Sequence, residues 1–190
     1  MRRPIAATAC TVSAVVTLTG CGRDRIEPPE TLRPAPPAGS APESFPQAGV
    51  RLDRPGNWPF AAGRPPLVAS ASSGTATVAL WRYLRSEPLP RGGSQLDDAE
   101  TALEGAAKTR DPTFALDETK RLRVDGEPAI QLLGDETVAG QKRRVRSTHV
   151  YAEGAEIVLD AYAPANEFAR LDRDVFAPMI RSLRIGAPTG

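Results

Sequence analysis

From residue 48 to the C-terminus, apolar and polar residues alternate along short segments, which is the pattern of β-strands. The segment from Thr75 to Leu84 carries apolar side chains on both of its faces, so we expect a central strand that is covered on each side. Asp125-Gly126 predicts a tight hairpin, because the favoured two-residue turns need positive φ, and Glu153-Gly154 predicts another. The other expected strands are 50–52, 67–70, 114–124 (as one strand or two), 129–133, 141–152 and 155–163.

Two further segments have the 3.6-residue apolar spacing of amphipathic helices. The first begins at Ser94, whose hydroxyl can cap the free amides, and Asp111-Pro112 ends it. The second lies between Pro164 and Leu183, where Pro178 should break or kink it or begin a new helix. The order of strands and helices predicts an α+β domain over residues 48–190, with a central antiparallel β-sheet flanked by helices.

The N-terminal 20 residues have the layout of an export signal, because two arginines precede a short apolar run that ends in small residues. The run from residue 5 to 18 has 14 residues, whereas a membrane-spanning helix needs about 20. Its end, Leu18-Thr19-Gly20-Cys21, resembles the lipobox of bacterial lipoproteins. The resemblance implies cleavage of the signal peptide between Gly20 and Cys21, acylation of Cys21, and a lipid anchor at the extracytoplasmic face of the cell membrane. An ordinary secretory signal is the alternative.

Residues 21–47 are rich in proline and poor in large apolar side chains. Such a composition offers little burial to offset the entropy of ordering, so we expect a disordered tether between the anchor and the domain. A proline motif that binds a partner is the alternative interpretation.

Composition argues against several classes of function. Removal of residues 1–20 takes away Arg2 and Arg3 and leaves 22 basic and 23 acidic residues, which is not the balance of a nucleic-acid-binding surface. His149 is the only histidine, and Cys10 and Cys21 are the only cysteines, so we expect no metal site and no disulfide in the mature domain. The sequence has no phosphate-loop or dinucleotide pattern, and we expect no cofactor.

The Glu153-Gly154 hairpin predicts a cluster of polar side chains on one face of the sheet. In the expected register Ser147 lies opposite Asp160, and His149 lies on the same face, so the residue types of a hydrolase triad come together. A serine in the middle of a strand has its neighbouring amides committed to the sheet, whereas a catalytic serine needs amides aimed at an oxyanion. We therefore predict a polar sheet face and no enzyme; a Ser/His hydrolase is the alternative.

A dense basic run begins the strand 141–152. Alternation places Lys142, Arg144 and Arg146 on one face of the strand and Arg143 on the other. These three cations can contact anionic lipid headgroups or an acidic partner, or they can pair with carboxylates such as Asp135 and Glu136 on the preceding strand.

Three segments of the domain resemble the PsbP-like superfamily, which includes the LpqN-type lipoproteins of actinobacteria. They are Val-Asp-Gly-Glu-Pro-Ala at 124–129, Ala-Tyr-Ala-Pro at 161–164 and Phe-Ala-Pro-Met-Ile-Arg-Ser-Leu at 176–183. The resemblance implies a central antiparallel sheet flanked by helices, and a binding or accessory module without catalysis. We therefore expect a membrane-anchored envelope lipoprotein that acts as a non-enzymatic module, which binds an envelope protein partner or supports an envelope process; a carrier of a lipid or another apolar small molecule is the alternative.

Overall fold

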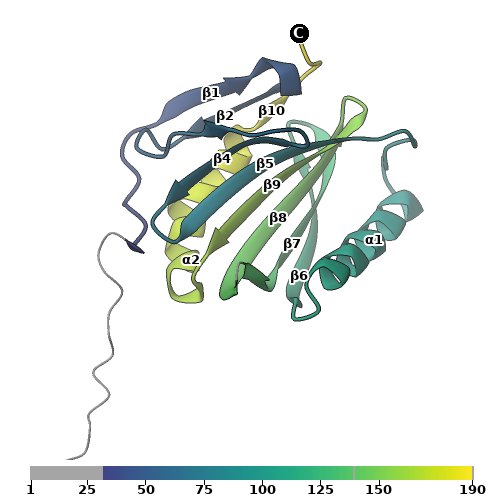
Figure 1. Cartoon of the computed structure of the whole chain (residues 1–190). Coiled ribbons are helices and arrows are strands. Elements are labelled where there is room, and N and C mark those ends of the chain that lie inside the picture. Colours follow the sequence, from purple (N-terminus) through teal and green to yellow (C-terminus); the bar gives the residue numbers. More distant parts are fainter. Residues whose placement is uncertain (1–31, 139, 190) are drawn as a thin grey trace, which may run out of the picture.

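A large antiparallel sheet forms the centre of the domain (Figure 1). The computed structural model describes residues 32–138 and 140–189, so the predicted signal peptide and Cys21 lie outside the described residues. The large sheet has seven strands in the order β3-β4-β5-β9-β8-β7-β6. Its strands are β3 (Ala61–Ala62), β4 (Leu67–Ser73), β5 (Ala76–Leu84), β6 (Ala115–Val124), β7 (Glu127–Val138), β8 (Gln141–Ala152) and β9 (Ala155–Ala163). The expected α+β class with an antiparallel sheet is confirmed.

Both predicted hairpins are present. Asp125 and Gly126 have φ of 53° and 83°, and Glu153 and Gly154 have φ of 49° and 65°, as primed turns require. The second hairpin sets the predicted register of β8 and β9, with Ser147 opposite Asp160. The segment 115–124 is one strand.

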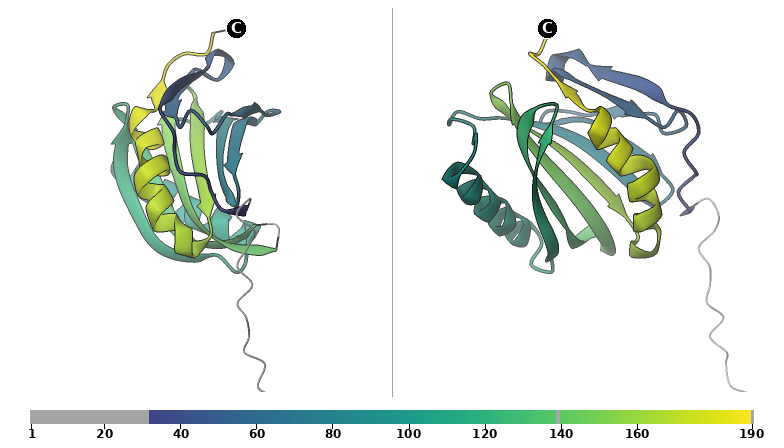
Figure 2. Two further views of the ribbon diagram at one scale, coloured as in Figure 1. Left: turned by 90° about the vertical axis from the view of Figure 1, so that its left-hand side faces the viewer. Right: turned by 180° about the vertical axis from the view of Figure 1, so that it is seen from behind.

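Helices cover opposite faces of this sheet. Helix α1 (Ser94–Arg110) packs its apolar side on the sheet, where Leu96, Ala99 and Leu103 lie against the cluster of Ile130, Leu132 and Tyr151 on β7 and β8. The other face is covered by α2 (Ala165–Leu171), a π-helical turn (Asp172–Phe176) and α3 (Ala177–Ser182), which together enclose the main hydrophobic core (Figure 2). Among the residues that the structure describes, no helix is both long and apolar enough to cross a membrane.

Two details of the helices were not fixed by the sequence pattern. Gly93, and not Ser94, is the N-cap of α1; its carbonyl accepts hydrogen bonds from the amides of Leu96 and Asp97, and no side chain caps the helix. Pro178 lies in the first turn of α3, directly after the π-helical turn. Proline has no amide to donate, and it lies where the regular i→i−4 ladder is already interrupted, because the Ala177 amide donates to the Asp172 carbonyl five residues back.

The structure differs from the sequence-based expectation over the second half of the predicted tether. Ala41–Phe45 form strand β1, which pairs with β2 (Val50–Arg54) after a short 3₁₀ turn (Pro46–Ala48), and β10 (Arg184–Ile185) pairs with the other side of β2. Phe45 packs edge-to-face on Phe60, with ring centroids 5.5 Å apart. Pro42 is compatible with this strand because β1 is an edge strand, where a missing amide costs no ladder bond.

Residues before β1 also lie against the domain. The Leu32 carbonyl accepts a hydrogen bond of 2.9 Å from the Thr75 amide, and the Ala35 amide donates one of 2.8 Å to the Ser73 hydroxyl. Pro34 is buried. Few of these residues are strongly apolar, and their order comes from backbone hydrogen bonds to the β4–β5 turn, which composition does not reveal.

Candidate functional site

The predicted basic contact residues lie on one face at the start of β8, and the structure gives each of them an internal partner. Lys142 is 78% exposed, and its Nζ lies 3.6 Å from Asp135. Arg144 pairs with Asp117 and Asp135, and its guanidinium lies 5.8 Å from the centre of the Phe168 ring. The pairing with Asp135 that the sequence suggested is therefore present.

Arg146 is the most enclosed of the three. It donates hydrogen bonds of 2.5 Å to the Gln131 side-chain oxygen and 2.6 Å to Asp172 in the π-helical turn, and its side chain is 19% exposed. It therefore joins the sheet to the α2–α3 segment. Lys142 has the greatest freedom to meet an anionic partner, and such a contact by these residues stays a prediction.

The predicted polar cluster is a continuous chain of hydrogen bonds beneath α1. Ser147 Oγ lies 2.5 Å from Asp160 Oδ1 and 2.8 Å from His149 Nε2, and His149 Nδ1 lies 2.6 Å from Glu156 Oε1. Glu156 is 2% exposed and also pairs with Arg85, while Asp160 is 6% exposed. Sequence analysis brought together Ser147, His149 and Asp160 and missed Glu156. The same register places Glu156 opposite Tyr151, and therefore on the same face of the sheet as His149.

The three hydrogen bonds of this chain need three protons. If Asp160 is ionised, Ser147 donates to it; His149 Nε2 must then donate to Ser147, which leaves Nδ1 of a neutral imidazole without a proton for Glu156. A neutral serine and a neutral histidine supply only two protons, so one further proton resides within the chain.

The pKa values indicate where that proton resides. Burial and the nearby Arg110 and Arg85 guanidinium groups lower the pKa of His149 to about 3, so the imidazole stays neutral. Burial raises the pKa of Asp160, while the hydrogen bond that Ser147 donates to it and the nearby Arg110 guanidinium act in the opposite direction. With a neutral imidazole, the further proton resides on one of the two buried carboxyl groups at the ends of the chain, Asp160 or Glu156.

The cluster has little room for a substrate. The adjacent cavity has a volume of about 40 Å³ and is closed by α1 residues that include Leu103 and Ala107. Ser147 also lies in the middle of a strand paired on both sides, opposite Leu132 and Asp160. This geometry supports a proton-holding structural chain rather than acyl transfer. Among the described side chains, no group of three or more His, Cys, Asp or Glu is arranged to hold a metal ion.

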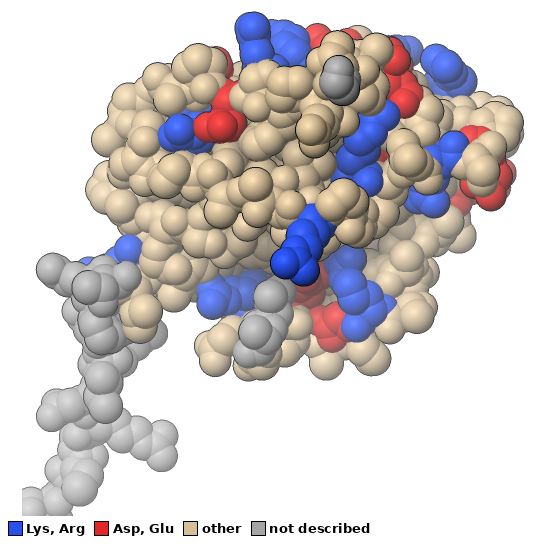
Figure 3. Space-filling model, turned by 45° about the horizontal axis from the view of Figure 1, so that its top comes forward, with Lys and Arg blue, Asp and Glu red and all other residues tan. Residues whose placement is uncertain are grey.

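A larger hollow, which we call the apolar groove, lies between the three-stranded sheet and the β3–β4–β5 edge of the large sheet, where β4 begins and β5 ends. Its volume is about 780 Å³. It is lined by residues of 44–48 and 62–68, by Arg82 and Leu84, and by Pro188 and Thr189. Leu84 is 79% exposed, and Figure 3 shows few charged side chains over the side of the molecule that carries β1, β4 and β5.

Sequence analysis missed the apolar groove because it is assembled from four separate segments, one of which was assigned to the tether. The available signal was Leu84, a large apolar residue at the end of a strand just before a polar loop. Such a residue is a weak signal, because single exposed apolar side chains are common on protein surfaces.

Comparison with known proteins extends the description of the fold. No protein-family model matches the chain, and no curated protein sequence matches it. Among solved structures it resembles cyanobacterial PsbP (CyanoP) from Synechocystis sp. PCC 6803, with a TM-score of 0.61 and 13% identity over 89% of this chain and 99% of that one. The chain has a PsbP-like fold.

Two further structures share this PsbP-like fold. LpqN, involved in cell envelope biogenesis of Mycobacterium tuberculosis, has a TM-score of 0.52 and 18% identity over 77% of this chain and 84% of that one. The Ran-binding protein Mog1p of Saccharomyces cerevisiae has a TM-score of 0.52 and 8% identity over 79% and 97%. At these identities the likeness concerns the fold alone.

Proposed function

We propose that this protein is a lipid-anchored envelope module that binds a partner protein through the apolar groove and performs no catalysis. The observation that carries the proposal is the groove itself, because it is much larger than the cavity beside Ser147 and His149. The lipobox-like sequence ending in Cys21 supports the anchor. The fold shared with LpqN, which is involved in cell envelope biogenesis, agrees with an envelope role.

The shape of the groove favours a segment of a partner protein. Small-molecule sites bury most of the surface of their ligand, whereas Leu84 at the edge of this groove is 79% exposed. The groove, with a volume of about 780 Å³, is large enough to hold several apolar side chains of a bound segment.

Arg82 adds a preference for charge. It is the one charged side chain among the described residues that line the groove, and its Nη1 and Nη2 donate hydrogen bonds of 2.8 and 3.0 Å to the carbonyls of Ala48 and Glu153. Neither bond neutralises its charge, and both fix its position. The fitting partner is therefore an apolar segment that carries a carboxylate.

The experiment is site-specific photo-crosslinking in intact cells. A photoreactive residue at Leu84 or Val68 should give a defined crosslinked product, whereas one at the exposed Thr101 on α1 should not. Arg82→Gln should lower the yield at Leu84 without loss of the protein from the membrane. Equal yields at Leu84 and Thr101 would contradict the proposal.

A carrier of a lipid or another apolar small molecule is the second candidate, because the volume of the groove lies within the usual range of ligand sites. Native mass spectrometry of the protein purified from envelopes distinguishes the two. A co-purifying ligand that is lost in Leu84→Asp supports the carrier, and bare protein supports the partner segment.

A further inference from the structure

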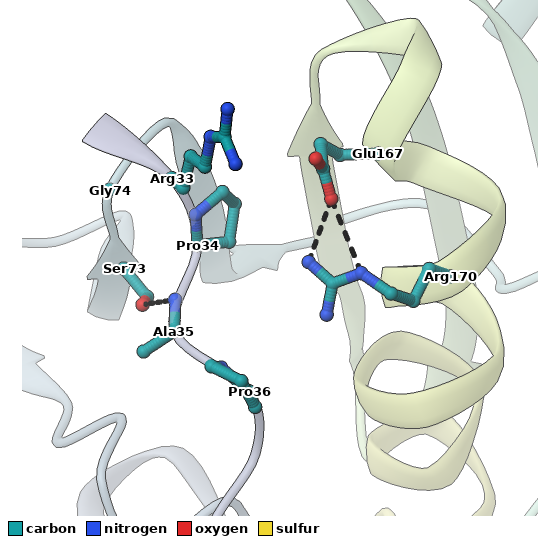
Figure 4. Close-up of a pocket in the computed structure, with 8 residues that line it drawn as sticks. All are labelled: Arg33, Pro34, Ala35, Pro36, Ser73, Gly74, Glu167 and Arg170. Carbon is teal, nitrogen blue, oxygen red and sulfur yellow. Dashed lines mark hydrogen bonds and ion pairs between the residues drawn. The ribbon is translucent and has the colours of Figure 1, made fainter. Parts of the chain in front are cut away.

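The described chain begins at one end of the large sheet, which we call the tether end. Leu32 is hydrogen-bonded to Thr75 in the β4–β5 turn, and residues 33–36 run beside Ser73 and Gly74 (Figure 4). The β7–β8 turn lies at the same end, because Arg143 donates a hydrogen bond to the Thr75 carbonyl. Any anchor placed before Leu32 therefore pulls on this end of the domain.

The apolar groove lies at the opposite end. Strand β5 runs between the two ends, from Ala76 beside the β4–β5 turn to Leu84 in the groove. Nine residues in a strand at about 3.3 Å each separate the ends by roughly 25–30 Å.

Basic side chains gather at the tether end. Lys108 lies in the last turn of α1, and this turn is held beside β7 by a hydrogen bond from the Thr137 amide to Asp111. Lys142 and Arg143 begin β8. A hollow of about 580 Å³ between the N-terminal segment and α2 is lined by two further guanidinium groups, those of Arg33 and Arg170 (Figure 4).

Several of these cations are available to an external anion. Lys108 is exposed and forms no ion pair among the described residues, and the acceptor of Arg143 is a neutral carbonyl. Lys142 is 78% exposed. Four carboxylates at this end have cationic partners: Glu136 pairs with Arg110 and Glu167 with Arg170, while Asp117 and Asp135 pair with Arg144, and Asp135 also lies 3.6 Å from Lys142. Lys108 and Arg143 remain without a carboxylate partner among the described residues, so the surface keeps an excess of positive charge.

The length of the preceding chain determines which surface these cations can meet. Ten residues, and so eleven Cα–Cα steps, separate Cys21 from Leu32; an acylated Cys21 therefore lies at most about 40 Å away, and about 20 Å away for a flexible coil. We infer that the tether end rests on anionic lipid headgroups and that the apolar groove faces away from the membrane. This inference rests on the anchoring at Cys21 in the proposed function. Each lysine or arginine near an anionic surface strengthens its attraction about fivefold.

A single site of the domain can be labelled for a direct test. Cys10 and Cys21 are the only cysteines of the chain; the first lies in the predicted signal peptide and the second is acylated, so an introduced cysteine is the only free thiol. The acylated protein is reconstituted into vesicles of phosphatidylcholine with or without 30% phosphatidylglycerol, with a fluorophore on Gln141→Cys at the tether end or Ser86→Cys at the groove end. Quenching by headgroup spin-labelled lipid is then measured. We expect at least threefold stronger quenching at residue 141 than at 86, in anionic vesicles only.

The charge variants complete the test. Lys108→Glu with Lys142→Glu should remove most of the quenching at residue 141, and Arg51→Glu with Arg91→Glu, away from the tether end, should not. Equal quenching at both labels, or quenching independent of lipid charge, would overturn the inference. The proposed function is tested separately. A protein mass without acyl chains would contradict anchoring at Cys21, and the absence of a crosslink at Leu84 would contradict partner binding in the apolar groove.

Discussion

Arg146 of β8 donates a hydrogen bond of 2.6 Å to Asp172, and this ion pair joins the sheet to the π-helical turn between α2 and α3. The two side chains are 19% and 20% exposed. The pair explains why one member of the predicted basic surface is not an open charge. The pair also holds the π-helical turn on the sheet, because Asp172 is the first residue of that turn and Arg146 belongs to β8.

The Arg146–Asp172 pair gives the first prediction. Asp172→Ala leaves the Arg146 charge without its carboxylate and should lower the free energy of unfolding by about 2–3 kcal/mol. Arg146→Met combined with Asp172→Leu removes both charges and should be closer to the wild type. Urea denaturation measures both, and a double variant that is less stable than Asp172→Ala would contradict this account.

Acid should destabilise the protein through His149. Its pKa is lowered to about 3 in the fold, against about 6.5 in an unfolded chain. Between these values the unfolded state binds a proton that the folded state does not, so the free energy of unfolding falls as the pH decreases from 6.5 towards 3. The slope is at most about 1.4 kcal/mol per pH unit. Asp160 acts in the opposite direction: its pKa is raised, so its contribution falls as the pH rises above about 4.

Urea denaturation between pH 4 and 7 tests this assignment. His149→Gln should flatten the acid side of the stability curve, because glutamine can accept and donate hydrogen bonds and does not titrate. Lys142→Gln, at an exposed position, is the matched control and should leave the slope unchanged. An unaltered slope in His149→Gln would assign the acid sensitivity to other groups.

We expect no hydrolysis by the Ser147–His149 pair. The adjacent cavity of about 40 Å³ holds little more than a water molecule, and the backbone around Ser147 is committed to strands on both sides. The purified protein should hydrolyse a short p-nitrophenyl ester no faster than its Ser147→Ala and His149→Ala variants do. A rate above background that both substitutions abolish would restore the hydrolase interpretation.

Strand β1 should contribute to stability although its composition resembles a linker. Phe45 packs edge-to-face on Phe60, so Phe45→Ala should lower the free energy of unfolding by about 1–2 kcal/mol. In a double-mutant cycle with Phe60→Ala, the coupling between the two rings should be about 0.5–1.5 kcal/mol. Additive effects would show that the rings do not interact in solution.

The large sheet was predictable because local signals determine it. Asp125-Gly126 and Glu153-Gly154 set the turns, and a two-residue turn fixes every pair along the strands that follow. The Glu153-Gly154 turn therefore predicts Ser147 opposite Asp160, as the structure shows. The fourth member of the chain, Glu156, was not recognised, because its link to His149 is diagonal across the strands and depends on the rotamers of both side chains.

The remaining features depend on contacts between distant segments. Strand β1 has five residues and a proline, and it is ordered by pairing with β2. The apolar groove forms only where four segments that are distant in the sequence, near residues 45, 65, 84 and 188, meet in the fold. The basic stripe of Lys142, Arg144 and Arg146 was placed correctly on one face, but the partners Asp117 and Asp172 come from β6 and the π-helical turn, which alternation along β8 cannot reveal.

The three-stranded sheet has a consequence for the order in which the molecule matures. Strand β2 is flanked by β1, made before it, and by β10, which consists of Arg184 and Ile185 near the end of the chain. The small sheet therefore cannot close until residues 184 and 185 have been synthesised, long after β2 itself. If the chain is exported through a channel, as the proposed anchoring requires, β2 keeps one unpaired edge until residues 184 and 185 have crossed.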